Sequence, residues 1–403
     1  MASKQQLSFL NLFLLWFGAS VSVAEILTGG FLAELGPTRG LLAILLGHAV
    51  GTSLLVLGGI IGFRERLPSI MSTRISFGRQ GSYLISLINI LQLIGWTAVM
   101  VFEGGTALNM LTTRLWGLDS RLLMSALLGA GIGFWIFMGI RGFKIVNMVA
   151  VTCLLGLTIV MSVVLLSQPF DWAGAPSGGS FALGIELSVI MPLSWFPLIA
   201  DYTSMSTSRR AAWLAPFLGY FLGSTWMYAI GLLGGIVSCS ADPSQMMLAA
   251  RLGMVALAVV GLSTVTTTFL DVYSAGVSLA NVFSRINVRL ASLVFTALGT
   301  VLAMALPITR YVDFLYLLGS VFAPLIAVLL ADYFLLRVDH RRRRRDLGAT
   351  LSLVLGIAFY HLVKSATLYI GPTLATIAFT FVLHMALRRL LPDRSASLEE
   401  TSG

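Results

Sequence analysis

The feature that most limits how this chain can fold is a succession of long apolar runs, joined by short connections that carry most of the charge. A helix that spans a membrane needs about 20 mostly apolar residues, and about twelve runs meet this length. They cover residues 8–34, 41–63, 82–111, 121–140, 145–167, 181–204, 211–237, 252–283, 288–306, 311–336, 348–364 and 371–390. The runs lack the alternation of apolar and polar residues that a spanning β-barrel requires, so helices are predicted.

The composition supports the same conclusion. Apolar residues make up 57% of the chain and charged residues 11%, whereas a soluble domain contains about 25% charged residues. So much apolar surface requires lipid as its solvent, which excludes disordered, fibrous, disulfide-framed and nucleic-acid-binding proteins. We therefore expect an all-α polytopic membrane protein of about 12 transmembrane helices, organised as a single transmembrane domain over residues 1–403.

The Lys and Arg residues are divided unevenly between the two sides of the predicted bundle. With the N-terminus inside, 20 of the 26 cations lie on the inner side and 6 on the outer side. Short cytoplasmic loops are rich in Lys and Arg, so we expect a multi-pass protein of the plasma (inner) membrane with both termini cytoplasmic. The run Arg341–Arg345 could be a patch for nucleic acid or lipid, but its position favours an anchor beside anionic membrane lipid.

Two of the runs contain interruptions at matching places. The first ten runs divide into halves over about 8–167 and 181–336, with extra helices over about 348–390; many transporters contain two inverted halves whose first helices are broken. Run one contains Gly18-Ala19-Ser20-Val21-Ser22 at its middle. Run six contains Pro192 and Pro197, which remove two backbone donors. Carbonyls freed at a break can ligate a cation, and freed N–H groups can hold a polar substrate.

Acidic residues inside the runs also need a role, because a charge at the bilayer centre costs roughly 2.5–3.5 kcal/mol. Glu25 lies in the first break and could touch substrate or form a hydrogen bond to unwound backbone. Glu103 follows Trp96 by seven residues on much the same helix face. Asp332, near the cytoplasmic end of run ten, is interpreted as an interface residue solvated by headgroups and arginines. Asp201 is interpreted as a contact at the inner end of a helix.

Run eight carries hydroxyl groups on one face, followed by an acid. Ser263, Thr266, Thr267 and Asp271 are spaced i, i+3, i+4 and i+8. These hydroxyls could serve only to pack helices together. Alternatively, with carbonyls of the first break, they could form an all-oxygen site for a small hard cation. The residues alone do not decide between these two interpretations. Trp96 and Trp195 lie deep in their runs, where aromatic faces can sandwich a flat heterocycle. His48 is interpreted as a hydrogen-bonded core residue rather than a proton relay.

Several segments, taken in order, resemble one family across nearly the whole chain. They are Ala24-Glu25-Ile26-Leu27-Thr28-Gly29-Gly30, Ile75-Ser76-Phe77-Gly78 with Gly81-Ser82, Gly95-Trp96, Pro192-Leu193-Ser194-Trp195 with Ala200-Asp201-Tyr202, and Ala331-Asp332-Tyr333. The chain resembles the nucleobase–cation symporters that include cytosine and hydantoin permeases. Within that family it is most similar to the branch of hydroxymethylpyrimidine permeases (CytX-type).

The resemblance implies a LeuT-type fold, with a five-plus-five inverted repeat and two extra C-terminal helices, that works by alternating access around a central site. By position, it implies that Trp96 stacks on the substrate. It also implies a sodium site, which favours the cation interpretation of run eight. The implied ligands are the carbonyls of Gly18 and Val21 and the hydroxyls of Ser263, Thr266 and Thr267. No cofactor is implied apart from a bound Na⁺.

We therefore expect a symporter, not an enzyme, that imports a small planar pyrimidine together with Na⁺ or H⁺. The substrate-binding candidates are Trp96, Trp195, Glu25, Ser194, Thr268 and Glu103. The cytosine branch has Asn and Asp where Thr268 and Phe269 stand here, and a small residue in place of Glu25. These departures favour an aminopyrimidine other than cytosine, such as hydroxymethylpyrimidine or a related thiamine precursor, because a carboxylate can pair with an exocyclic amine and a ring nitrogen.

Two alternatives remain. The same fold could carry cytosine, a purine, another nucleobase or an amino acid. A polytopic membrane enzyme would instead need paired histidines and carboxylates at ligand spacing facing one leaflet, and the sequence shows no such constellation.

Overall fold

The structure is a computed structural model that describes residues 6–138, 140–172, 178–283, 285–305, 310–366 and 368–390, with side chains for all of these except 140–148, 151 and 266. Every regular element within these ranges is a helix. In chain order they are α1 (Phe9–Ser20), α2 (Val23–Gly30), η1 (Ala33–Leu35), α3 (Gly36–Glu65), α4 (Ser69–Ser72), α5 (Arg74–Trp116), α6 (Arg121–Met138), α7 (Ile140–Leu166), α8 (Phe181–Ser194), α9 (Phe196–Thr203), α10 (Arg209–Ser238), α11 (Pro243–Ala249), α12 (Gly253–Val282), α13 (Val288–Ala305), α14 (Tyr311–Leu330), η3 (Ala331–Leu336), α15 (Leu347–Val363) and α16 (Gly371–Leu390).

The predicted apolar runs correspond to helices of the structure. Among the described residues, eight helices are long and apolar enough to cross a membrane, and two bent pairs can each form one further span. Residues 152–166 of α7 and the whole of α15 are shorter apolar helices. The all-helical membrane architecture is therefore confirmed, while the total of about twelve spans stays a prediction. The short helices α4 and α11, which lie in connections, are not foreseen by the hydropathy pattern.

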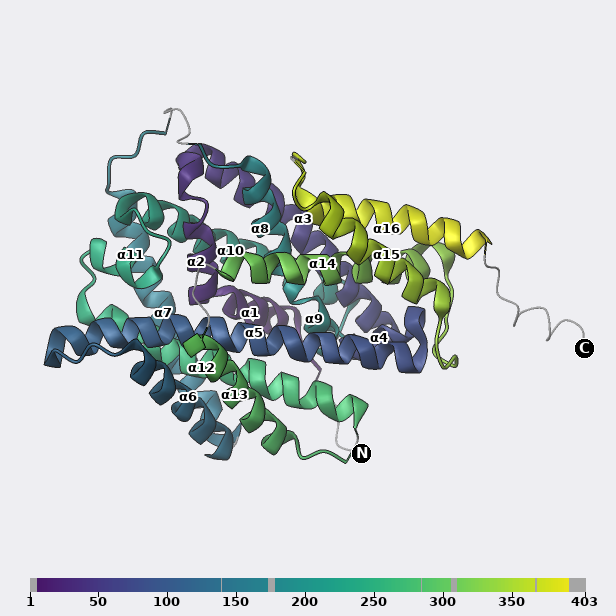
Figure 1. Ribbon diagram of the computed structural model, residues 1–403, viewed down its shortest axis with the longest axis horizontal. Coiled ribbons are helices and arrows are strands. Elements are labelled where there is room, and N and C mark those ends of the chain that lie inside the picture. The colour runs from purple at the N-terminus through teal and green to yellow at the C-terminus, as the bar shows by residue number, and fades with distance from the viewer. Residues whose placement is uncertain are drawn as a thin grey trace, which may run out of the picture.

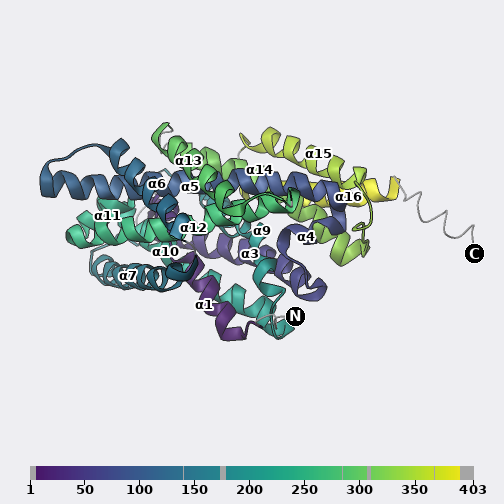
Figure 2. The same cartoon turned by 90° about the horizontal axis from the view of Figure 1, so that it is seen from below.

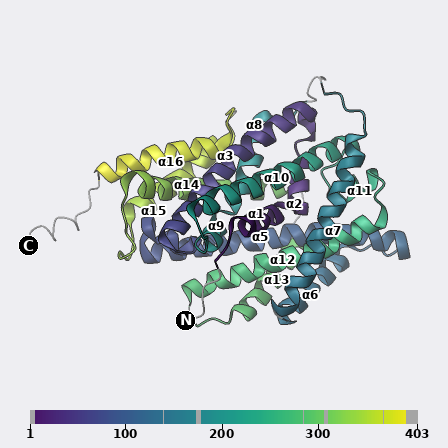
Figure 3. The same cartoon turned by 180° about the vertical axis from the view of Figure 1, so that it is seen from behind.

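The helices are arranged around α5, which runs through the molecule in every view (Figure 1, Figure 2). Helices α15 and α16 lie at one end, and α6, α7 and α11 lie at the other. Helix α5 packs mainly against α12 and α13, whereas α10 packs against α1, α2 and α3 (Figure 3). One group of helices is thus α5, α12 and α13, and the other is α1, α2, α3 and α10. The two groups meet where the broken spans α1–α2 and α8–α9 face α5 and α12.

The first span breaks where the sequence predicts. Helix α1 ends at Ser20 and α2 begins at Val23, and their axes differ by 54°. Ser22 has an extended backbone, and its hydroxyl accepts a hydrogen bond of 3.1 Å from the N–H of Ala24. This N-cap satisfies one of the N–H groups that the break leaves without an intrahelical partner. Gly29 has a different use, because a Cβ there would overlap the backbone of Tyr228 in α10.

The second span breaks at Trp195, between α8 and α9, with a bend of 42°. The sequence suggested that the two prolines prevent a regular helix. In the structure, however, neither proline is itself the irregular residue. Pro192 lies inside α8, and Pro197 lies in the first turn of α9, where a missing N–H costs nothing. The irregular residue falls between the two prolines.

The extra helices α15 and α16 are attached to α8 through a buried carboxylate. Glu186 accepts hydrogen bonds from the Tyr360 hydroxyl (2.8 Å), the Thr373 N–H (2.9 Å) and the Thr373 hydroxyl (2.6 Å). Gly371 has φ +76° and lies against Glu186, which leaves no room for a Cβ. Glu186 is therefore an anchor between helices.

The connection after η3 docks on the start of α5. At Gly78 the helical conformation is interrupted by φ +72° and ψ −178°, and a Cβ there would lie 2.9 Å from the carbonyl oxygen of Arg343. The N–H groups of Arg79 and Gln80 donate to the carbonyls of Arg343 (3.1 Å) and Arg344 (2.9 Å). The arginine run, predicted as a lipid anchor, thus also holds a helix start with its backbone.

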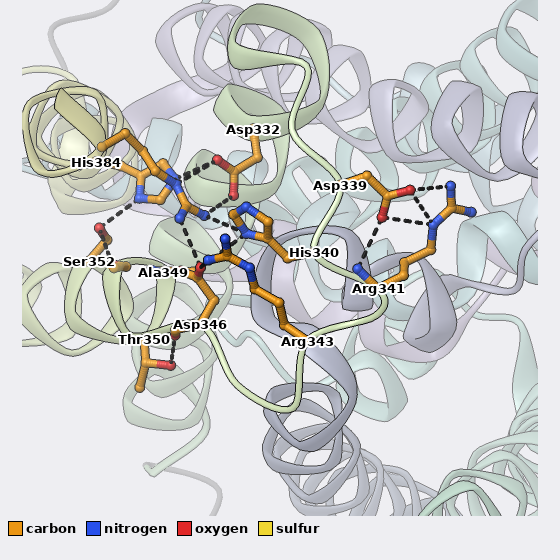
Figure 4. Close-up of polar contacts among 12 residues, drawn as sticks. Asp332, Asp339, His340, Arg341, Arg343, Asp346, Ala349, Thr350, Ser352 and His384 are labelled. Carbon is orange, nitrogen blue, oxygen red and sulfur yellow. Dashed lines mark hydrogen bonds and ion pairs between the residues drawn. The ribbon is translucent and has the colours of Figure 1, made fainter. Parts of the chain in front are cut away.

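A network of charged side chains fixes the same region to α16 (Figure 4). Asp332 is fully buried and accepts from His384 Nε2 (2.9 Å) and from Arg388 Nη2 (2.9 Å). Arg388 also donates to Asp346 (2.9 Å), which contacts His340 Nδ1 at 3.0 Å. The predicted arginine partner of Asp332 is confirmed by Arg388. The predicted contact with headgroups is wrong, because the carboxylate is fully buried and Arg388 and His384 replace solvent.

The pair His340–Asp346 is predicted to make stability depend on pH. Burial acts to lower the pKa of His340, but the hydrogen bond and charge of Asp346 outweigh it and raise that pKa above its ordinary value. A raised histidine pKa contributes stability that is complete below the unfolded pKa of about 6.5 and is lost as the pH rises through the folded value. The pKa of Asp346 lies below its ordinary range despite burial, because His340, the Ala349 N–H and Arg388 hydrogen-bond to it.

Thermal unfolding in detergent, followed by tryptophan fluorescence, measures this effect. The variant H340Q keeps a hydrogen-bond donor but cannot carry the charge. We expect H340Q to melt roughly 2–4 °C below the wild type at about pH 6 and close to it at about pH 9. The control H361Q changes an exposed histidine at the end of α15 and should show no such difference. An equal loss at both pH values would contradict the prediction.

Candidate substrate and cation site

A cavity lies where the two broken spans face α5 and α12. Both breaks contribute to its wall, as the sequence predicts for a central site. The described residues that line it are Ala19, Ser22, Ala24, Glu25, Gln92, Leu93, Trp96, Met100, Met191, Ser194, Trp195, Leu198, Thr267 and Asp271. Of the six substrate-binding candidates, four line this cavity: Trp96, Trp195, Glu25 and Ser194.

The two tryptophans are held rigidly by other aromatic rings. Trp96 of α5 packs edge-on against Phe314, with centroids 5.3 Å apart and planes at 83°, and against Tyr311. Trp195 packs edge-on against Trp16 at 6.0 Å and 84°. Since such packing restricts rotation of the indole rings, both present fixed apolar surfaces to the cavity.

Glu25 lies in the first turn of α2 and is 2% exposed. Its Oε1 accepts from the Tyr220 hydroxyl at 2.8 Å, and its Oε2 accepts from the Ser224 hydroxyl at 2.7 Å. Within the described residues, the hydrogen-bond donors to Glu25 are these side chains of α10 rather than the suggested unwound backbone. The residue nevertheless lines the cavity, which keeps a contact with substrate available.

Gln92 is a cavity residue that sequence reasoning missed. Its Nε2 donates to Asn89 Oδ1 (2.8 Å) and to the carbonyl of Ser194 (3.1 Å), which joins α5 to the second break. Its Oε1 is buried without a hydrogen-bond partner, so it can accept from a bound ligand. The available signal was its spacing, since a polar residue four before Trp96 shares that face of the helix.

Two predicted substrate residues lie outside the cavity wall. Thr268 is buried, and its hydroxyl donates to the carbonyl of Thr264 at 2.7 Å within α12. Glu103 is 2% exposed and has an oxygen without a hydrogen-bond partner. Although Glu103 shares a face with Trp96, seven residues of helix separate them by about 10 Å along the axis. The prediction for Glu103 rested on this shared face, which extends beyond the cavity wall.

The cation-site candidates are only partly brought to the cavity. Thr267 lines it, and its hydroxyl donates to the carbonyl of Ser263 at 3.0 Å. Ser263 is buried within α12 and does not line the cavity, and the side chain of Thr266 lies outside the described residues. Gly18 and Val21 lie at the first break, whose neighbours Ala19 and Ser22 line the cavity with Thr267. The ligand set itself stays a prediction.

The cavity wall contains acidic side chains and, among the described residues, no basic ones. Its described residues include two acids, Glu25 and Asp271, and no Lys, Arg or His. Asp271 lies one turn beyond Thr267 on the same face of α12. A pocket whose titratable side chains are all acidic attracts positive ions, so this arrangement suits a cation or a ligand rich in hydrogen-bond donors.

Two broken helices around a central cavity place the chain among membrane transporters of the LeuT type, and comparison with known proteins specifies the family. Residues 2–348 match the family described as permease for cytosine/purines, uracil, thiamine, allantoin. The cytosine permease of Escherichia coli strain K12 is 30% identical over 380 residues, which cover 88% of this chain and 85% of that protein. A purine-cytosine permease of Emericella nidulans is 23% identical over 425 residues, covering 92% and 81%. The chain therefore belongs to the nucleobase–cation symporter family, and it is a transporter rather than an enzyme.

Solved structures agree on the fold. The inward-facing conformation of the transporter Mhp1 matches with a TM-score of 0.82 at 19% identity, covering 95% of this chain and 90% of that one. Mhp1, described as a nucleobase-cation-symport-1 family transporter, in a closed conformation with bromovinylhydantoin bound, matches with a TM-score of 0.77 at 19% identity, covering 96% and 93%. A Na⁺-coupled sialic acid symporter matches at 0.59 and 10% identity, covering 95% and 96%. The LeuT-type fold implied by the sequence is confirmed.

The position of Thr267 on the cavity can be tested against its neighbour. In a background where Cys153 and Cys239 are replaced by Ser, the variants T267C and T268C differ by one helix position. We expect a small, polar thiol reagent to modify T267C about tenfold faster, because only that thiol reaches the cavity. Labelling of purified protein, followed by mass spectrometry, measures the rates. Equal rates would place the cavity wall elsewhere on α12.

Proposed function

We propose that this protein is a secondary active importer of a small planar pyrimidine, coupled to Na⁺ or H⁺ by alternating access. Hydroxymethylpyrimidine, or a related thiamine precursor, is the proposed substrate. The observation that carries the proposal is the cavity between two broken helices, lined by two fixed indoles and two carboxylates. The family description, which names cytosine, purines, uracil, thiamine and allantoin, supports a nitrogen heterocycle.

The lining residues suggest how a flat ring is held. Trp96 and Trp195 stack on the apolar faces of the ring, since each presents a fixed indole to the cavity. Glu25 binds donors on the polar edge, such as an exocyclic amine, and Gln92 Oε1 accepts a further donor. Ser194 contributes at the second break. Neither Thr268 nor Glu103 is part of this proposal, because both lie outside the cavity wall.

The cation is proposed to bind between the first break and α12. Gly18 and Val21 supply carbonyl oxygens, and Ser263, Thr266 and Thr267 supply hydroxyls. Because Thr267 and the residues flanking these carbonyls line one cavity, substrate and cation bind close together. Coupling requires that both ligands favour the same conformational state, so that each raises the affinity for the other.

Cytosine is the second candidate substrate. The 30% identity to a cytosine permease favours it, while Glu25 at the cavity favours a pyrimidine with more donors. The distribution of Lys and Arg supports insertion in the plasma membrane with both termini cytoplasmic.

Transport by reconstituted vesicles tests the proposal. We expect uptake of labelled hydroxymethylpyrimidine that an inward Na⁺ or H⁺ gradient stimulates, with cytosine and purines competing more weakly. Vesicles without an imposed gradient are the control. Uptake that no imposed ion gradient changes would contradict symport, and stronger competition by cytosine would replace the proposed substrate with the second candidate.

The role of Trp96 can be measured separately. We expect W96A to weaken substrate binding by about tenfold, because stacking of a base on an aromatic ring contributes about 1–3 kcal/mol. The matched control is W213F, which alters a tryptophan that is 39% exposed on α10 and lies outside the cavity wall. Equilibrium binding of labelled substrate to purified protein gives both affinities. Unchanged affinity in W96A would remove this residue from the site.

A further inference from the structure

A chain of hydrogen bonds leads from the cavity into the protein interior through three helices. Glu25 of α2 lies on the cavity wall, and the Ser224 hydroxyl of α10 donates to its Oε2 at 2.7 Å. Ser224 Oγ in turn lies 2.8 Å from Nε2 of His48 in α3. Ser224 and His48 are fully buried and do not line the cavity. Neither substrate recognition nor the predicted cation ligands use these two residues.

The contacts around Glu25 leave its charge without a cation. In the described part of the chain its carboxylate accepts only from the hydroxyls of Tyr220 and Ser224, and no Lys or Arg forms an ion pair with it. Burying an ionised carboxylate without a counter-charge is costly, and buried charges are normally paired or neutralised. A proton can supply the missing positive charge directly on the carboxylate, without any space beyond that of the observed contacts.

The other titratable groups near this chain add no positive charge. The nearest are the hydroxyls of Tyr220 and Tyr228 of α10 and Tyr311 of α14, and the carboxyl group of Asp271 of α12. Farther away, on neighbouring helices, are three more acids: Glu103 of α5, Asp242 at the N-cap of α11 and Glu186 of α8. The Tyr228 ring meets the His48 ring edge-on, with centroids 4.5 Å apart. The Tyr311 hydroxyl bonds to Thr28 at 2.6 Å, one turn beyond Glu25. Glu186 is occupied by Tyr360 and Thr373.

The geometry points to Glu25, Ser224 and His48 as a binding site for one coupling proton. This inference rests on the proposed function and selects protons as a coupling ion. The proton enters at Glu25 from the cavity, and the Ser224 hydroxyl and the His48 imidazole complete the hydrogen-bond chain that holds it.

The hydrogen bonds can reverse without moving any heavy atom. We place the imidazole hydrogen of neutral His48 on Nδ1, because this ring also hydrogen-bonds to the backbone of Ile44, and Nε2 then presents a lone pair to Ser224. With Glu25 ionised, the Ser224 hydroxyl donates to Oε2 of Glu25. When Glu25 takes a proton, it can donate to Ser224, and the Ser224 hydroxyl can turn its hydrogen to Nε2. The triad carries one negative charge before this step and none after it.

The three residues belong to three separate helices, which gives the proton a way to bias conformation. Glu25 is on the half-helix after the first break, whereas Ser224 and His48 are on the continuous helices α10 and α3. A proton that neutralises the triad stabilises the state in which these helices are joined. Coupling to substrate follows if the cavity ligand favours that same state.

Infrared difference spectroscopy on purified protein tests proton binding without any substrate. From about pH 5 to about pH 9 we expect a band of a protonated carboxyl group to change in the wild type, to vanish in E25Q and to shift in H48Q and S224A. The control T52V alters another buried hydroxyl one turn beyond His48 on α3 and should leave the band unchanged. A band that E25Q retains, or that H48Q and S224A both leave unshifted, would overturn the proposal.

Transport assays then separate this inference from the proposed function. In vesicles with an inward proton gradient, we expect H48Q and S224A to accumulate about tenfold less substrate than the wild type, whereas T52V should accumulate as much as the wild type. Exchange of substrate across the membrane without a gradient should persist in T52V, because Thr52 neither lines the cavity nor belongs to the triad. Exchange by the wild type with no response to the proton gradient would reject the proton site alone. Absence of exchange of every pyrimidine tested would reject the proposed function, while the infrared result would still decide proton binding.

Discussion

The structure depends on a constraint imposed by lipid, namely that every backbone polar group within the membrane needs a partner inside the protein. Continuous helices meet this requirement by themselves, and this chain departs from them at Ser22 and Trp195. Both departures are buried among other helices and face a common cavity. The Ser22 hydroxyl supplies one missing acceptor at the first break. The interruptions therefore exist only where surrounding helices shield them from lipid, and that same place is the site.

Buried carboxylates fall into two kinds according to their partners. Glu186 and Asp332 connect the last two helices to the rest of the bundle, and each is saturated by donors from several elements. Asp332 has a guanidinium as counter-charge, which makes it a fixed anchor. Glu25 has hydroxyl partners only and borders the cavity. A carboxylate of the second kind can change its proton or ligand as the transporter changes state, whereas the anchors cannot without loosening the fold.

Much of the architecture could be predicted because hydropathy acts along the chain. Apolar runs of spanning length become helices, and a serine-rich or proline-flanked segment inside a run marks a break. Trp96 and Trp195 were predicted to lie at the site because both lie deep in their runs, whereas tryptophans are more usual at the membrane interface. Thr268 and Glu103 were predicted at the site but lie outside the cavity wall, since sharing a helix face does not fix the distance to a cavity. Gln92 was missed because only the second break, at Ser194, shows what it contacts.

The sequence by itself determined the class of solvent, the helical spans and the positions of the two breaks, because these follow from local composition and from backbone hydrogen bonding. Only the tertiary structure decided which acids are anchors and which borders the cavity. Partners such as Arg388 for Asp332, or Ser224 and His48 for Glu25, are separated from them by tens to hundreds of residues. The electrostatic state of a buried group is set by neighbours in space, and those neighbours are defined only once the helices pack.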